Sequence, residues 1–124
     1  MLQRIVTVGA VLGALASPLA AQAAKPQGNE MTLTGTVIDL NCYVANGATG
    51  ASHKGCAEAC AKAGVQLGIL SSDGTIYVPV SSKPADPTSP KLVSHAETKV
   101  KVTGTHRMTN GLHTIEIKTV DAAT

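Results

Sequence analysis

The strongest constraint on folding in this chain is the Asn110-Gly111 pair, which separates two runs of alternating residues. In residues 99–108 and 112–120, an apolar side chain recurs at about every second position, the period of a strand with one buried face. Asn-Gly is the strongest short signal for a two-residue hairpin turn. The sequence therefore predicts a tight hairpin with Val102, Ile115 and Ile117 in the core.

The turn also fixes which residues of this hairpin lie opposite each other. It pairs Thr109 with Leu112, Met108 with His113, His106 with Ile115, and Gly104 with Ile117. The buried face then ends beside the turn in His106, Met108 and His113. Two imidazoles and a thioether are acceptable copper ligands, so these three residues form a secondary metal candidate. The alternatives are histidines at a solvent edge and a methionine that fills the core.

Three more strands and one helix are predicted upstream. Residues 31–40 are rich in β-branched residues, with Gly35 as a bulge or a point of close contact. Residues 65–70 and 75–80 flank a Ser-Ser-Asp-Gly turn and form a second hairpin. A short helix is expected over residues 53–63, because Ser52 can cap its start and Gly64 its end. Three prolines within residues 81–91 predict an irregular loop.

The order of these elements resembles a known architecture. The opening Thr34-Gly35-Thr36-Val37-Ile38-Asp39, the later Val100-Lys101-Val102-Thr103-Gly104-Thr105 and the closing hairpin resemble the small exported bacterial OB-fold proteins. This resemblance implies a mainly β fold, a small five-stranded OB-like barrel. In this chain the one short helix is expected between strands 1 and 2, whereas the usual helix between strands 3 and 4 is replaced by the proline loop. No catalytic residue is carried over.

The N-terminal residues predict export. Residues 1–23 combine Arg4, an apolar run and an Ala-Gln-Ala cleavage series at positions 21–23, the pattern of a secretory signal peptide. Residues 24–30 are then a flexible leader, and residues 31–120 are a single OB-like β-barrel domain. The mature protein is expected in the periplasm or secreted, with no membrane association once the signal is removed. The alternative is an N-terminal anchor, but the apolar run is shorter than a membrane span.

Cys42, Cys56 and Cys60 are an odd number of cysteines for an oxidising compartment, so they cannot all pair within one chain. On a helix, His53, Cys56 and Cys60 share one stripe, and Cys42 approaches from the end of the first strand. Three thiols and an imidazole suit zinc, and sulfur also suits copper. We therefore predict one metal site, for copper first and zinc second.

Two other uses of these cysteines remain open. A disulfide from Cys42 to Cys56 or Cys60 would fasten the helix to the sheet and stabilise a small core by about 2 to 4 kcal/mol. A reactive thiol or an intermolecular bridge is the other alternative. If the cysteines form a disulfide, the protein is a periplasmic binding or accessory domain without metal. If they bind a metal ion, the protein serves in metal handling or in redox and electron transfer.

Composition excludes several other functions. The chain has a net charge of +2 and two tyrosines as its sole aromatic residues. It therefore lacks the basic groove and the stacking aromatic side chains with which proteins bind nucleic acids. The sequence carries no hydrolase or metalloprotease motif, and His53 with Cys56 has no third group that would orient a nucleophile pair. The expected partners are a metal ion and another periplasmic protein, and no catalytic residue is assigned.

Overall fold

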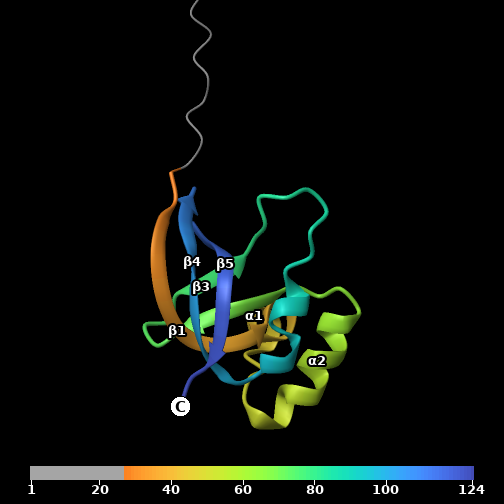
Figure 1. The fold of residues 1–124 in the computed structure, drawn as a ribbon. Coiled ribbons are helices and arrows are strands. Elements are labelled where there is room, and N and C mark those ends of the chain that lie inside the picture. Colours follow the sequence, from red (N-terminus) through yellow and green to blue (C-terminus); the bar gives the residue numbers. More distant parts are fainter. Residues whose placement is uncertain (1–26) are drawn as a thin grey trace, which may run out of the picture.

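The computed structural model describes residues 27–124 and shows a mainly β protein (Figure 1). The strands are β1 (Asn29–Asp39), β2 (Leu67–Ser71), β3 (Ile76–Pro79), β4 (Lys99–Thr109) and β5 (Leu112–Ala122). They are hydrogen-bonded in a ring in the order β1-β2-β3-β5-β4, and β4 closes on β1. The β3–β5 pair is parallel and the other pairs are antiparallel. The predicted signal peptide lies outside the described residues.

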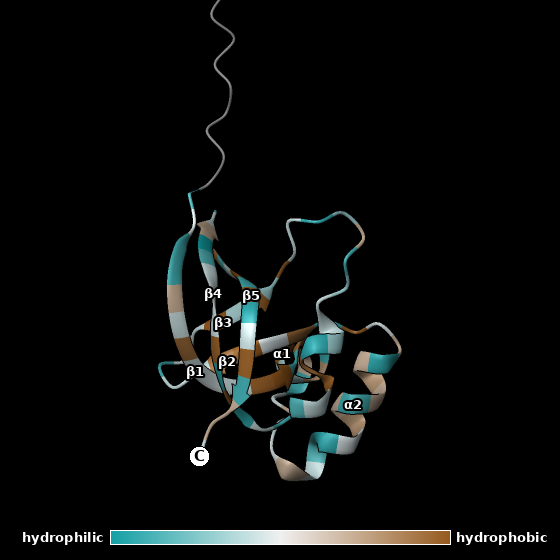
Figure 2. Cartoon of the chain, in the orientation of Figure 1, coloured by the Kyte–Doolittle hydropathy of each residue, from teal (hydrophilic) through white to brown (hydrophobic). Residues whose placement is uncertain are grey.

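The closing hairpin confirms the predicted register. Met108 lies opposite His113, His106 opposite Ile115, and Gly104 opposite Ile117, with a register shift between Thr103 and Gly104. Along β1, β4 and β5, hydrophobic and hydrophilic residues alternate (Figure 2). The apolar face fills the ring with a core of aliphatic side chains that includes Leu33, Val37, Leu67, Ile69, Leu92, Val100, Val102, Ile115 and Ile117.

This register makes a direct stability prediction. Val102 is fully buried, whereas its neighbour Thr103 is partly exposed on the opposite face. Val102→Ala should therefore lower the free energy of unfolding more than Thr103→Ala, by about 1 kcal/mol or more. Chemical denaturation of both variants measures the difference. Equal losses in the two variants would contradict the assignment of the faces.

The helices differ from the prediction of one helix over residues 53–63. The segment between β1 and β2 holds two α-helices, α1 (Leu40–Asn46) and α2 (Lys54–Lys62), and the 3-10 turn η1 (Ala51–His53). Leu40, expected at the end of the strand, instead begins α1. The side chain of Asp39 caps this helix by accepting a hydrogen bond from the Cys42 amide, and Gly47 ends it in the left-handed conformation.

Helix α2 packs on the outside of the ring with small residues. Ala57 and Ala61 are one turn apart and buried, and α2 contacts β1 and two further 3-10 turns, η2 (Ser89–Lys91) and η3 (Val93–His95). The proline loop predicted over residues 81–91 thus ends in helical turns that help to cover the core, since Leu92 between them is fully buried. Among the described residues, no helix has the length and hydropathy that crossing a membrane requires.

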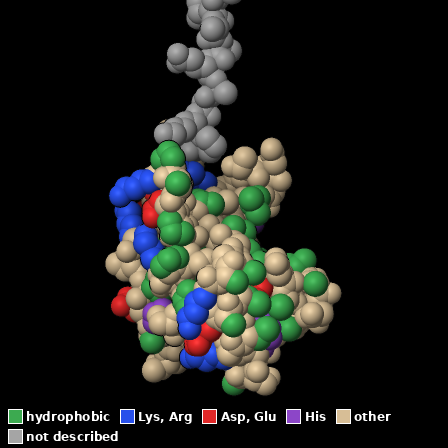
Figure 3. All heavy atoms as spheres, turned by 90° about the vertical axis from the view of Figure 1, so that its right-hand side faces the viewer, with side chains coloured by type: hydrophobic (Ala, Val, Ile, Leu, Met, Phe, Trp, Pro, Cys, Tyr) green, Lys and Arg blue, Asp and Glu red, His purple; other side chains and the backbone are tan. Residues whose placement is uncertain are grey.

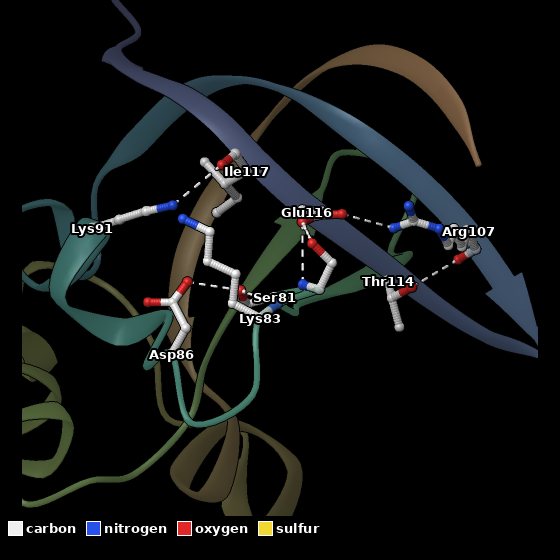
Figure 4. A network of polar contacts seen from close by, with 9 residues as sticks. Ser81, Lys83, Asp86, Lys91, Arg107, Thr114, Glu116 and Ile117 are labelled. Atoms are coloured by element: carbon white, nitrogen blue, oxygen red, sulfur yellow. Dashed lines mark hydrogen bonds and ion pairs between the residues drawn. The ribbon is translucent and has the colours of Figure 1, made fainter.

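The remainder of the proline loop is fastened to β5 by Glu116 (Figure 4). The carboxylate accepts hydrogen bonds from the amide of Ser82 at 3.1 Å and its hydroxyl at 2.5 Å, and from Arg107 at 3.1 Å. The hydrogen bonds from the Ser82 hydroxyl and amide, followed by that from Arg107, lower the pKa of Glu116 from 4.5 to about 2.

Acidification should therefore reduce the stability that this attachment contributes. A carboxyl group with a lowered pKa in the folded state contributes stability above pH 4.5 and loses it as the pH falls toward 2. Between pH 6 and pH 3, Glu116→Gln should lose less stability than the wild type in thermal unfolding. Asp121→Asn, an exposed change on the same strand, is the control. An unchanged pH dependence in Glu116→Gln would refute this role.

Candidate metal centre

The end of β1 and the three helical elements that follow it bring the predicted ligands together. Cys42 lies on the first turn of α1, His53 ends η1, and Cys56 and Cys60 lie one turn apart on α2. The ligand atoms of Cys42, His53 and Cys56 lie within 4.8 Å of one another. Cys60 falls in a second group, with Cys42 and Asp39, at the same spacing. The four predicted ligands are thus divided between two groups that share Cys42.

His53 is oriented by a buried carboxylate, Glu97. Its Nδ1 lies 2.9 Å from Oε1 of Glu97, whose side chain is fully buried. The other oxygen, Oε2, accepts hydrogen bonds from the hydroxyl of Thr49 and the amide of Gly50, both at 2.8 Å. Because Glu97 holds Nδ1, Nε2 is the nitrogen left for a ligand. A carboxylate behind a histidine in this way fixes the ring and its tautomer at metal sites.

Glu97 itself is held in place by the sheet. Its amide donates to the carbonyl of Val37 at 2.8 Å, and its φ of 55° is in the left-handed region, which non-glycine residues seldom adopt. In this conformation, the segment between η3 and β4 directs the carboxylate of Glu97 toward the loop of residues 47–53. A strained conformation that aims a buried charge at one histidine is typical of functional sites.

Asp39 contributes a second buried carboxylate beside the thiols. It is fully buried, and Oδ1 accepts the hydrogen bond from the Cys42 amide at 3.1 Å. Oδ2 is buried and receives no hydrogen bond of ordinary geometry from the described residues. Most buried polar atoms in proteins have a partner, so an oxygen without one beside two thiols indicates a place for a further group.

The thiols are crowded by groups that become negative. The adjacent carboxylate of Asp39, burial and the neighbouring Cys56 raise the pKa of Cys60 to about 12. Burial, with smaller effects from Asp39 and Cys56, also raises the pKa of Cys42. All three cysteines are free of disulfides in the structure. Since thiolates must form for a metal to bind, uptake of a cation displaces protons from this cluster.

The cluster opens to solvent on one side. Cys56 is exposed, whereas Cys42, His53 and Cys60 are half-buried. Figure 3 views the molecule from the side that carries α2 and shows acidic and basic side chains scattered among uncharged ones.

The secondary candidate on the hairpin is brought together in part. Nε2 of His106 lies 3.1 Å from Nδ1 of His113, and the ring of Tyr77 packs edge-on against both imidazoles. The two nitrogens face each other across a hydrogen bond. Met108 lies opposite His113 on the other strand, and its side chain is 58% exposed. Copper binding by these three residues stays a prediction.

Sequence reasoning missed the two carboxylates. Asp39 lies three residues before Cys42, which is the spacing between a residue that caps a helix and the amide it binds. This spacing is visible in the sequence and is a signal that could have identified Asp39. Glu97 is 44 residues beyond His53, and no local pattern connects the two. Comparisons with protein-family models, with curated proteins and with solved structures found no match for this chain.

Proposed function

We propose that this protein binds a thiophilic metal ion through the cysteine and histidine cluster between β1 and β2, and that it serves in metal handling. The observation that carries the proposal is the convergence of Cys42, His53 and Cys56 from three separate elements, with Glu97 bound to the rear nitrogen of the imidazole. Thiolate and imidazole ligands with an oriented histidine are the donor set of zinc sites, and copper(I) also accepts sulfur.

The donors favour zinc as the first candidate and copper as the second. Copper(I) prefers soft sulfur, whereas zinc accepts sulfur, nitrogen and carboxylate oxygen together. The buried carboxylate of Asp39 beside Cys42 and Cys60 therefore suits zinc better, which reverses the order expected from the cysteines alone.

The arrangement suits an exchangeable ion. Three protein ligands leave one tetrahedral position unfilled, and Cys56 lies on the exposed side of the cluster. An incoming ligand from another molecule has access to that position. This geometry supports uptake and delivery of the ion.

The scaffold of the proposal is an OB-like barrel. The strand order β1-β2-β3-β5-β4 with β4 returning to β1 supports the resemblance to five-stranded Greek-key OB-folds. The helices between β1 and β2, which carry the cysteines, are additions to that plan. Export to the periplasm or beyond remains part of the proposal, carried by residues 1–23.

Metal affinity is the direct test. In competition with a chelator, Cys56→Ser should bind zinc at least about 100-fold more weakly than the wild type, since even partners behind the ligands contribute 10- to 100-fold. Cys56 is exposed, so its replacement leaves the core intact. His95→Ala is the control, because His95 lies on η3 and belongs to neither group of ligands. The zinc affinity of this variant should equal that of the wild type.

Thiol counting separates this function from the disulfide alternative. With the ion bound by Cys42, His53 and Cys56, Cys42 and Cys56 should react with a thiol reagent only after a chelator has removed the ion. A native Cys42 disulfide, together with no uptake of zinc or copper after gentle reduction, would overturn the proposal in favour of a disulfide-stapled domain.

A further inference from the structure

The second group of candidate ligands consists of Asp39, Cys42 and Cys60. Its atoms lie within 4.8 Å of one another, and the buried Oδ2 of Asp39 has no hydrogen-bond partner among the described residues. Leaving a buried carboxylate oxygen unpaired is costly. A metal ion between this oxygen and the two sulfurs would satisfy it.

We propose that the cluster holds two metal ions, bridged by the thiolate of Cys42. One ion is bound by Cys42, His53 and Cys56, and the other by Cys42, Cys60 and Asp39. This inference rests on the proposed function and extends it to a binuclear site. A thiolate sulfur has more than one lone pair, so it can bind two ions at once, and Cys42 is the one residue common to both groups.

The distances allow each group to close on an ion. Zinc lies about 2.3 Å from sulfur and about 2.0 to 2.2 Å from nitrogen or oxygen, so ligands of one tetrahedral ion are roughly 3.3 to 3.8 Å apart. The spread of up to 4.8 Å within each group requires side-chain movements of about an ångström. Both α2 cysteines and His53 lie on short elements at the edge of the fold, where such movements leave the ring of strands unchanged.

The charges of the proposed ligands also match two ions. Cys42, Cys56 and Cys60 as thiolates and Asp39 as carboxylate carry four negative charges, which two divalent ions neutralise. A single divalent ion would leave uncompensated negative charge in a half-buried cluster, or would leave thiols protonated and without a role.

Asp39 links the bridging residue to the second ion. Oδ1 accepts the hydrogen bond from the amide of Cys42 at the start of α1, while Oδ2 is buried and has no hydrogen-bond partner among the described residues. Asparagine is as good a helix cap as aspartate but lacks the negative charge. Asp39→Asn should therefore keep α1 and lose the second ion.

Native mass spectrometry of the full chain during zinc titration tests the inference. The wild type should bind two zinc ions per chain, Asp39→Asn and Cys60→Ser should each bind one, and Cys42→Ser should bind neither tightly. Asp86→Asn, which changes a carboxylate in the distant loop, should still bind two. Circular dichroism checks that each variant is folded.

The outcomes distinguish this inference from the proposed function. One zinc ion per wild-type chain, unchanged in Asp39→Asn, would overturn the binuclear site and keep the metal function. No bound zinc or copper would overturn both. Two ions in the wild type and also two in Asp39→Asn would show that Asp39 is not a ligand and would refute the second group.

Discussion

Replacing Glu97 by alanine is expected to lower the free energy of unfolding of the metal-free protein by about 3 kcal/mol. The Glu97 side chain is fully buried, and three groups would lose their acceptor: the ring of His53, the hydroxyl of Thr49 and the amide of Gly50. These three hydrogen bonds are part-buried, and each contributes about 1 kcal/mol, or somewhat more when the acceptor is a carboxylate. Urea unfolding in the presence of a chelator measures the loss.

A glutamine at position 97 separates the effect on the metal from the effect on stability. Its amide oxygen can still accept from His53, so the stability loss should be smaller than for alanine. Without the negative charge behind the imidazole, zinc affinity should nevertheless fall about 10- to 100-fold. Glu58→Gln is the control, because Glu58 makes one exposed contact with Lys54 at 4.0 Å. A Glu97→Gln variant with wild-type affinity would exclude Glu97 as the orienting partner.

The hairpin could be predicted in detail because its determinants are local. Asn110-Gly111 fixes the turn, and a shift by one residue would bury Lys101 and Glu116 in place of Val102 and Ile115. Turn chemistry and burial thus favour the same register. The predicted close contact at Gly35 is also confirmed, since a Cβ there would lie 2.6 Å from the carbonyl oxygen of Leu70.

Helix α1 was missed because its own residues are weak helix formers. Asn41, Cys42, Tyr43 and Val44 have low helix propensity, and seven residues are too few for an isolated helix. Its caps at Asp39 and Gly47 supply the missing stability. The apolar residues that precede Asp39 belong to β1. Because Leu40 follows them closely, the sequence pattern predicts that it continues the strand.

The carboxylates of the candidate site depend on tertiary structure. The parallel bridge between Val37 and Ala96 places the residue after Ala96 beside β1, and the amide of Glu97 is then bound by Val37. The cysteine spacing along α2 is local and could be recognised. The position of Glu97 depends on long-range pairing of β1 with the segment before β4, and no sequence window contains both.

Gly104→Ala is expected to be the most damaging small substitution in the sheet. A Cβ at this position would lie 2.4 Å from the carbonyl oxygen of Glu116 and 3.0 Å from Cγ1 of Ile115. The first contact is with backbone, so no side-chain rotation relieves it. Strands β4 and β5 must separate at the register shift beside Gly104, and the free energy of unfolding should fall by about 3 kcal/mol or more.

Gly55→Ala is the matched control, and it should have the opposite sign. Gly55 lies in the first turn of α2, has no heavy atom within 4 Å of an added Cβ, and is not among the glycines with positive φ. Alanine there should raise stability by about 0.5 to 1 kcal/mol, because it restricts the unfolded chain and favours the helix. Thermal and urea unfolding of both variants give the comparison. If Gly104→Ala were as stable as the wild type, β4 and β5 could not approach as closely as this register requires.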